Sequence, residues 1–383
     1  MRRLGDVAEL ISGQHVNAEH VNSAGIGNPY LTGPSDFDAG KPRATKWTKH
    51  GKAFCEPGDI LITVKGSGCG TMAIADRRYV ISRQLMAIRP LNIHVGFLWA
   101  TLSREIARLN AMSSGTIPGL TRDQILKIPI PHFSHKVQRW IGDLDNLLTR
   151  LQQCLRSLIA AKREFQRGLM QELLTGRRRF PEFEGRPVEK CPFGSIVELR
   201  NEHYFPDKSN PRRCIELEHI ESGTGRITGE TLTTSENSVK FAFSAGDVLF
   251  GRLRPYLKKY AFPSFSGVCS TEIWVLRPRS ADLLPEFLFL LVQGEEVQRA
   301  ANVTSGSKMP RASWAVVAQA LVPMPTIEEQ RKICDIIASL DRELAALTEL
   351  ATHYQAQRRG LMQKLLTGEL TVPVSSEPEP VHA

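Results

Sequence analysis

The strongest constraint on this chain is that it repeats itself. The segment RGLMQELLTG at 167–176 returns as RGLMQKLLTG at 359–368, with nine of ten positions identical at an offset of 192. Weaker matches precede it in the same order: residues 57–61 match 245–249 at an offset of 188, and 128–131 match 322–325 at 194. Two copies of one structural unit are therefore predicted, with loops that differ in length.

The end of each copy has the pattern of a long helix. Apolar residues alternate at steps of four and three within 132–176 and 326–370, and no proline interrupts either run. Lys162 and Arg358 are the polar interruptions. The pattern predicts a heptad seam, formed by Ile141, Leu144, Leu148, Leu151, Leu155 and Leu158 in the first helix and by Ile333, Ile337, Leu340, Leu344, Leu347 and Leu361 in the second.

These two seams need a partner surface. An apolar stripe along a helix of this length cannot stay in water, and the chain offers two stripes of equal length. Pairing of the two helices as an antiparallel coiled-coil spacer is therefore favoured. The alternative is that each helix is buried separately against its own globular part.

The parts that precede the helices have mixed α/β patterns. Short apolar runs follow a Gly-Asp turn at 59–64 and 247–250, and they are expected to form strands that pair with 85–88 and 273–276. Helical spacing follows in both copies, at 97–111 and 287–300.

The predicted fold class is α/β, with two mixed α/β domains separated by a pair of long antiparallel coiled-coil helices. The predicted boundaries are 1–131 for the first domain, 132–176 for the central helix, 177–190 for a basic linker, 191–325 for the second domain, 326–370 for the C-terminal helix and 371–383 for a disordered tail.

The charge of the chain suits a polyanionic partner. Its net charge is +9, and residues 1–131 carry 16 Lys and Arg against 10 Asp and Glu. Residues 191–325 carry 15 against 14, so a nucleic-acid surface there must come from local clustering.

Such a cluster occurs at 252–260, in the sequence RLRPYLKKY. Arg252, Arg254, Tyr256, Lys258 and Lys259 are candidate DNA contacts, because cations bind phosphates and base edges while an aromatic ring packs on a sugar or base. The alternative for this run is a solvated charged face.

Further candidate DNA contacts lie in small or hydroxyl-rich segments. The counterpart of 252–260 in the first copy contains one cation and three glycines, whose amides can bind phosphate. The other candidates are Lys65, Ser67, Arg83, Thr116 and Arg122 in the first copy, and Lys308 and Arg311 in the second. For these loops the alternative is an ordinary turn.

No catalytic, cofactor or metal site is predicted. Gly66-x-Gly68-x-Gly70 is followed by strand-like sequence where a dinucleotide-binding loop must open into a helix. The seven cysteines are scattered, without a Cys-x-x-Cys pair. Asp59 and Asp247 are expected to stabilise turns. No apolar run approaches the roughly 20 residues that span a membrane, so a soluble cytoplasmic protein without a membrane partner is expected.

Three segments of the second copy resemble the target-recognition domains of Type I restriction–modification specificity subunits: GDVLF at 246–250, RLRPYL at 252–257 and TSGSKMPR at 304–311. VPMPTIEEQRKI at 322–333 resembles the entry to that family's helical spacer. The first copy departs from the pattern, with HFSHKV at 132–137 in place of the acidic entry and no Arg-rich counterpart of 252–259.

The resemblance implies a DNA-reading subunit that is not itself an enzyme. Each domain would read one half of a bipartite, asymmetric site in double-stranded DNA, and the helices would set the gap. Two modification subunits, which bind S-adenosylmethionine and methylate adenine, would dock on the chain. Two restriction subunits that use ATP and Mg could join them.

Two other functions stay open. One is recognition within another restriction or phage-defence assembly. The other is a DNA methyltransferase or nuclease whose motifs are not visible, which S-adenosylmethionine binding by the isolated chain would support. An exposed seam also predicts that the chain aggregates without its partner.

Overall fold

A computed structural model describes residues 1–38, 40–66, 68–112, 119–186, 188–207, 209–233, 238–303 and 309–372, without the side chains of 110–112. It divides into two compact units. Unit 1 comprises Met1–Arg156 and Glu349–Ala383, and unit 2 comprises Ser157–Thr348. Both division points fall inside long helices, α3 (His135–Thr175) and α8 (Ile327–Thr367). Each unit therefore contains one globular part and a portion of both helices.

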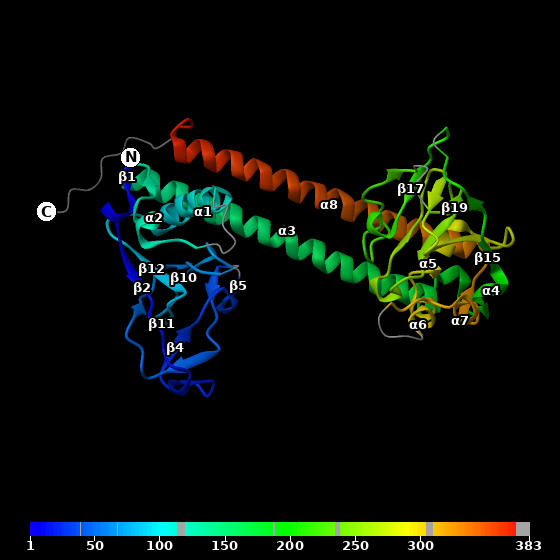
Figure 1. Ribbon diagram of the computed structural model, residues 1–383, viewed down its shortest axis with the longest axis horizontal. Helices are drawn as coiled ribbons and strands as arrows, with labels where there is room; N and C mark the ends of the chain where they lie inside the picture. The colour runs from blue at the N-terminus through cyan, green and yellow to red at the C-terminus, as the bar shows by residue number, and fades with distance from the viewer. Residues whose placement is uncertain are drawn as a thin grey trace. The chain divides into compact units, whose positions relative to one another are not determined.

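Unit 1 is built on two main sheets (Figure 1). The four-stranded sheet has the order β10 (Met72–Ile74), β9 (Ile60–Thr63), β12 (Leu85–Pro90) and β2 (Ala8–Ser12). The five-stranded sheet has the order β3 (Val21–Asn22), β7 (Lys46–Thr48), β4 (Asn28–Leu31), β11 (Tyr79–Ile81) and β8 (Phe54–Cys55). The smaller pairs are β1 (Arg2–Arg3) with β13 (Pro129–Ile130), and β5 (Phe37–Asp38) with β6 (Lys41–Pro42). The helices of this globular part are α1 (Val95–Met112) and α2 (Arg122–Leu126).

Unit 2 repeats this plan. Its four-stranded sheet has the order β15 (Val197–Arg200), β23 (Ile273–Pro278), β20 (Val248–Gly251) and β21 (Tyr260–Ala261). Its five-stranded sheet has the order β16 (His203–Tyr204), β19 (Lys240–Phe243), β22 (Gly267–Cys269), β17 (Arg213–Ile215) and β18 (Thr231–Leu232). The remaining elements are β14 (Glu189–Pro192) paired with β24 (Leu321–Met324), and helices α4 (Phe193–Ile196), α5 (Pro285–Leu291), α6 (Glu295–Ala301) and α7 (Trp314–Val317).

The strands expected from the Gly-Asp turns are present. β9 and β20 are fully buried, and they pair antiparallel with β12 and β23 as predicted. The helix expected at 97–111 is confirmed as α1. The single helix expected at 287–300 is wrong, because the chain forms α5 and α6 instead. The first helix ends at Leu291 with Val292 as its C-cap, and Gly294, in an extended conformation, is the N-cap of the second.

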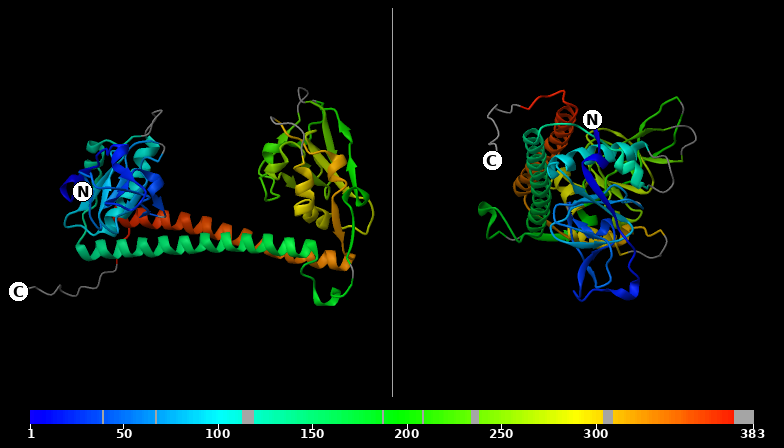
Figure 2. Two further views of the ribbon diagram at one scale, coloured as in Figure 1. Left: turned by 90° about the horizontal axis from the view of Figure 1, so that it is seen from below. Right: turned by 90° about the vertical axis from the view of Figure 1, so that its left-hand side faces the viewer.

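Within each unit the two long helices lie side by side and antiparallel (Figure 2). In unit 1, Arg358 of α8 donates to Asp145 of α3 at 2.7 Å and to Gln152 at 3.2 Å. In unit 2, Lys162 of α3 pairs with Glu343 of α8. The two polar interruptions of the apolar pattern therefore form ion pairs between the helices.

The predicted seam is wrong by one position on part of α3. Leu151 and Leu158 are 49% and 45% exposed, whereas Gln152 and Ile159 are buried. Because Arg358 neutralises Asp145 and hydrogen-bonds Gln152, the face of α3 that packs on α8 is not its most apolar face. The other ten predicted seam residues are buried or half-buried, namely Ile141, Leu144, Leu148, Leu155, Ile333, Ile337, Leu340, Leu344, Leu347 and Leu361.

The helix ends also belong to the globular cores. Ile141 of α3 and Leu365 of α8 lie in the core cluster of unit 1 that contains Phe97. Leu173 of α3 and Ile333 of α8 lie in the core of unit 2. Both predicted modes of burial, pairing and packing on a globular part, therefore occur along the same helices.

A buried glutamine joins each spacer helix to its domain. Gln138 accepts from the backbone N–H of His94 at 3.0 Å, just before α1. Gln330, at the matching position of α8, accepts from Leu284 N–H at 2.9 Å, just before α5. The sequence Gln-Arg occurs at both 138–139 and 330–331, so the two units share this hydrogen bond between a long helix and the globular part.

The segment predicted as a linker, 177–190, carries local structure in its described part. It contains a 3-10 turn at Pro181–Phe183, and β14 begins at Glu189. Arg179 forms an ion pair with Glu329 of α8 at 2.6 Å. Of the predicted tail, 373–383 lie outside the described residues. Within the described ranges, no helix is long and apolar enough to cross a membrane.

Candidate nucleic-acid interface

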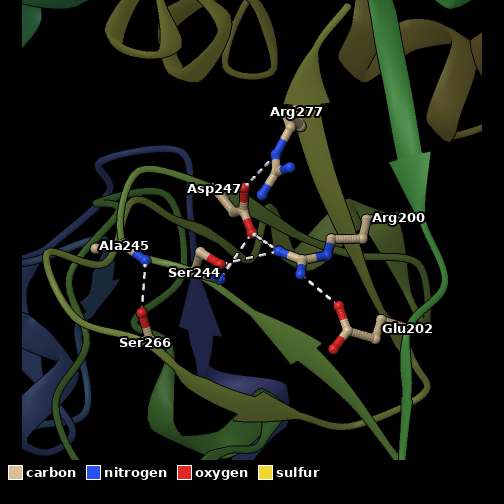
Figure 3. Close-up of polar contacts among 7 residues, drawn as sticks. All are labelled: Arg200, Glu202, Ser244, Ala245, Asp247, Ser266 and Arg277. Carbon is tan, nitrogen blue, oxygen red and sulfur yellow. Dashed lines mark hydrogen bonds and ion pairs between the residues drawn. The ribbon is translucent and has the colours of Figure 1, made fainter.

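The basic run of unit 2 follows a strand that is held at its start by a buried carboxylate. Asp247 accepts from Arg200 Nη1 at 3.2 Å, from Arg277 Nε at 3.1 Å and from Ser244 N–H at 2.7 Å (Figure 3). Asp59 in unit 1 accepts in the same way from Arg89 and from the N–H of Glu56. Both acids stabilise the turn before the strand, the role expected for them from the sequence.

After β20 the chain forms a strained loop. Arg254 and Lys258 adopt left-handed conformations, with φ of 50° and 49°. The loop is held by backbone hydrogen bonds from Arg254 N–H to Pro310 O and from Gly223 N–H to Lys258 O. In unit 1, Gly66 and Gly70 hold the matching positions with φ of 90° and 87°. Non-glycine residues rarely adopt this conformation, and strain of this kind concentrates at functional sites.

The loop lies beside a second segment that the sequence singled out. Leu253 forms a bridge with Arg311, and Ala312 N–H donates to Arg252 O at 2.8 Å. Arg252 N–H donates to Glu272 O at 2.9 Å. These bonds form one backbone frame, which brings the basic run, the residues after 308 and the start of β23 together.

Two arginines in this frame share one carboxylate. Arg311 donates through Nη2 to Glu272 Oε1 at 2.7 Å and through Nε at 3.0 Å. Arg252 Nε lies 3.8 Å from Glu272 Oε2. The hydrogen bonds from Arg311 lower the pKa of Glu272 below its ordinary value. The carboxylate therefore stays charged and holds the guanidinium group of Arg311 in a fixed plane.

The same backbone frame exists in unit 1 with different side chains. Lys65 forms a bridge with Gly119, Leu120 N–H donates to Val64 O, and Val64 N–H donates to Gln84 O. The repeat therefore superimposes Val64 on Arg252, Gln84 on Glu272 and Gly119 on Arg311.

A pocket of about 530 Å³ opens beside the frame in unit 2. Its lining includes Arg252, Arg311, Trp274 and Trp314. The two indole rings lie edge to face, with centroids 5.5 Å apart. Cations and aromatic surface thus face the same hollow, a combination that suits a nucleotide or a base edge.

The predicted contact residues differ in how accessible their side chains are. Lys65, Arg83, Arg122, Arg254, Tyr256 and Lys258 are exposed. Arg122 donates to Ser12 Oγ at 3.2 Å. Lys259 donates to the carbonyls of Leu217 and Ile220 at 2.6 and 2.9 Å, which gives its ammonium group a structural role instead. Ser67, Thr116 and Lys308 lie outside the described residues.

Sequence reasoning did not single out Glu272 or Gln84. The signal was available, because the offset of 188 that aligns the two Gly-Asp turns also aligns these two residues. The sequence alone gives no reason to select Glu272, because its partner Arg311 lies 39 positions away along the chain.

The described residues show no metal centre: they contain no group of three or more His, Cys, Asp or Glu that could hold an ion. Burial raises the pKa of the Cys55 and Cys334 thiols to about 12, far from the value of a nucleophilic thiolate.

The family model described as Type I restriction modification DNA specificity domain matches residues 1–153 and 186–353. The chain is 21% identical over 354 residues to the Type I restriction enzyme EcoDI specificity subunit of Escherichia coli, covering 82% of this chain and 79% of that protein. It is also 21% identical over 400 residues to the MjaVIII specificity subunit of Methanocaldococcus jannaschii, covering 97% and 92%.

Solved structures share the fold. A chain from a structure of the type I R-M system matches with a TM-score of 0.65 and 16% identity, over 96% of this chain and 97% of that one. The S subunit of the M. genitalium Type-I restriction-modification system matches with a TM-score of 0.56 and 17% identity, over 95% of both chains. With two matches of one domain model that together span most of its length, the chain belongs to the family of Type I restriction modification DNA specificity domains.

Proposed function

We propose that the chain is a sequence-specific DNA-binding subunit of a Type I restriction–modification complex, in which each unit reads one half of a bipartite, asymmetric site. One observation carries this proposal. The same backbone frame occurs once in each unit, and it presents Arg252, Glu272 and Arg311 in one and Val64, Gln84 and Gly119 in the other. A duplicated scaffold with different side chains suits two half-sites of different sequence.

Joining two reading units in one chain has a physical advantage. Once one unit has bound its half-site, the second binding event is intramolecular, which raises the affinity. Helix pairing in each unit supports a spacer that fixes the distance between half-sites. Phosphate contacts would supply much of the affinity and make it fall as salt rises.

The catalytic groups would belong to partners in the cytoplasm. On this proposal S-adenosylmethionine binds a modification subunit that methylates adenine, and ATP and Mg bind a restriction subunit. Two copies of each are proposed.

An exposed apolar surface supports the docking of partners. In unit 1, Trp140, Leu147 and Leu151 of α3 are 39%, 54% and 49% exposed. In unit 2, Leu158 and Phe165 of α3 are 45% and 57% exposed. We name these residues the α3 stripe. Exposed apolar side chains at this spacing are typical of a helix that packs on another protein, and each unit offers one such surface for one modification subunit.

The test is selection of bound duplexes from a random-sequence DNA library by the full chain in complex with its modification subunit. The selected duplexes should share two short, unlike motifs separated by a fixed gap. A single continuous motif, or no enrichment with a well-folded complex, would contradict the proposal. Binding of S-adenosylmethionine by the chain alone would favour a methyltransferase instead, and recovery of a different partner set from the host would favour another defence assembly.

A further inference from the structure

The three frame positions differ between the units in chemistry but not in backbone geometry. Arg252 N–H donates to Glu272 O at 2.9 Å, as Val64 N–H donates to Gln84 O at 2.8 Å. Arg311 forms a bridge with the residue after Arg252, as Gly119 does with the residue after Val64. The difference between the units at this place is therefore a difference of side chains on one scaffold.

The side chains of unit 2 are arranged so that Arg311 keeps part of its guanidinium group available. Nε and Nη2 both donate to Glu272. Among the described residues Nη1 has no protein partner. Both arginines line the 530 Å³ pocket, and Glu272 is not among the described lining residues. Glu272 therefore fixes the Arg311 guanidinium group through these hydrogen bonds, beside a hollow that both arginines line.

Building on the proposed function, we infer that the Glu272–Arg311 pair determines the base preference of the second half-site, and that Gln84 and Gly119 hold the corresponding places for the first. Arg311 is the reading residue and Glu272 is its positioning residue. Arg252 contributes a second cation to the same carboxylate.

The chemistry of the two sets predicts different bases. An arginine held in a fixed plane matches the O6 and N7 acceptors of guanine. The amide of Gln84, which is exposed, matches N6 and N7 of adenine. We therefore expect a guanine contact in the second half-site that has no counterpart at the matching place of the first.

Glu272 has a second effect. A carboxylate near the DNA surface repels phosphate and so limits binding to DNA of unrelated sequence. Removing its charge while keeping its shape should therefore change affinity and discrimination in opposite directions. A residue needed only for folding would lower both.

The first experiment compares Glu272→Gln, Arg311→Lys and the unaltered chain, each as the full chain with its modification subunit. Competition binding uses the selected duplex and a duplex altered only in the second half-site. Glu172→Gln is the matched control, since Glu172 forms an exposed ion pair with Arg178 in the same unit. Both Glu272→Gln and Arg311→Lys should lower discrimination at the second half-site about tenfold. Glu272→Gln should also raise affinity for unrelated DNA, whereas the control should leave the discrimination unchanged.

The second experiment transfers the pair to unit 1. Among the described residues, a Cβ at Gly119 would meet only Val64 O, at 3.7 Å, and the φ of Gly119 is not in the left-handed region, so the backbone there accepts a residue with a side chain. The double variant Gln84→Glu, Gly119→Arg should therefore fold and change the base preference of the first half-site toward guanine, while the second half-site stays as it was.

Three outcomes decide the inference. The unaltered complex could select a split motif while Glu272→Gln and Arg311→Lys leave discrimination at the second half-site unchanged. That result would overturn the inference and leave the proposed function intact. An unchanged first half-site in the double variant would also overturn it. An unaltered complex with no sequence preference would overturn the proposed function and this inference together.

Discussion

At two positions unit 2 carries a basic residue in a backbone conformation that favours glycine. Arg254 and Lys258 both have φ near 50°, and unit 1 has Gly66 and Gly70 at the matching places. The left-handed conformation costs about 1 kcal/mol for a residue with a Cβ. Unit 2 has this unfavourable conformation at two residues with side chains, whereas unit 1 has glycines there. We infer that the side chains of Arg254 and Lys258 have a function.

This comparison gives the first prediction. Arg254→Gly should raise the free energy of unfolding of unit 2 by up to about 1 kcal/mol, because it relieves the strain. It should also weaken DNA binding several-fold, because it removes a cation that we propose contacts phosphate. Thermal unfolding and DNA binding of the complex measure the two effects. Asn92→Gly is the matched control, since Asn92 also has φ of 53° but lies outside the loop. A stable variant with unchanged DNA affinity would contradict the role of Arg254.

The second prediction concerns the buried acid below the loop. Asp247→Asn should lower the free energy of unfolding of unit 2 by about 3 kcal/mol, because Arg200 and Arg277 lose a buried charged partner. Glu202→Gln changes the exposed partner of the same Arg200 and should cost less than about 1 kcal/mol. Denaturant unfolding compares the two variants. Equal losses of free energy of unfolding in the two variants would show that the burial of Asp247 does not determine its contribution to stability.

At the scale of elements, the sequence predicts the strand after each Gly-Asp turn and its pairing strand, but it misplaces part of one helix face and misses the break between α5 and α6. The strand after each Gly-Asp turn is a short, mostly apolar run, and it is buried along its whole length. The seam of α3 could not be read from apolarity, because Asp145 and Gln152 enter it through bonds to Arg358, more than 200 positions away. The pair of Arg311 with Glu272 was missed for the same reason: a long-range partner decides the role of each side chain.

The α3 stripe gives the third prediction. Leu151→Glu should weaken binding of the modification subunit at least tenfold, because a charge then enters an apolar contact. It should also make the isolated chain less prone to aggregate. Gln153→Glu, at an exposed polar position of the same helix, is the control and should change neither property. Co-purification and light scattering measure both. Partner binding that survives Leu151→Glu would place the docking surface elsewhere.

A natural thiol reports on the same surface and gives the fourth prediction. Cys154 is exposed on α3, three positions after Leu151. In the chain alone it should react with a maleimide, and the modification subunit should protect it. Cys55 is the internal control, because its thiol is fully buried and burial raises its pKa to about 12, so it should stay unlabelled in both samples. Equal labelling of Cys154 with and without the partner would argue against docking on the α3 stripe.

At the scale of the whole molecule, we propose that two reading units in one chain recognise two unlike half-sites. The duplicated frame, the paired helices in each unit and the two matches of one domain model support it. The difference between the frames, with charged residues in unit 2 and uncharged residues in unit 1, predicts an asymmetric site.

The most direct measurement is a map of the adenines that become methylated in a host genome when the chain is produced with its modification subunit. The account predicts a split motif, with two unlike half-sites and one fixed gap, and methylation that disappears without this chain. A continuous motif, two identical half-sites, or methylation that persists when the chain is absent would contradict it.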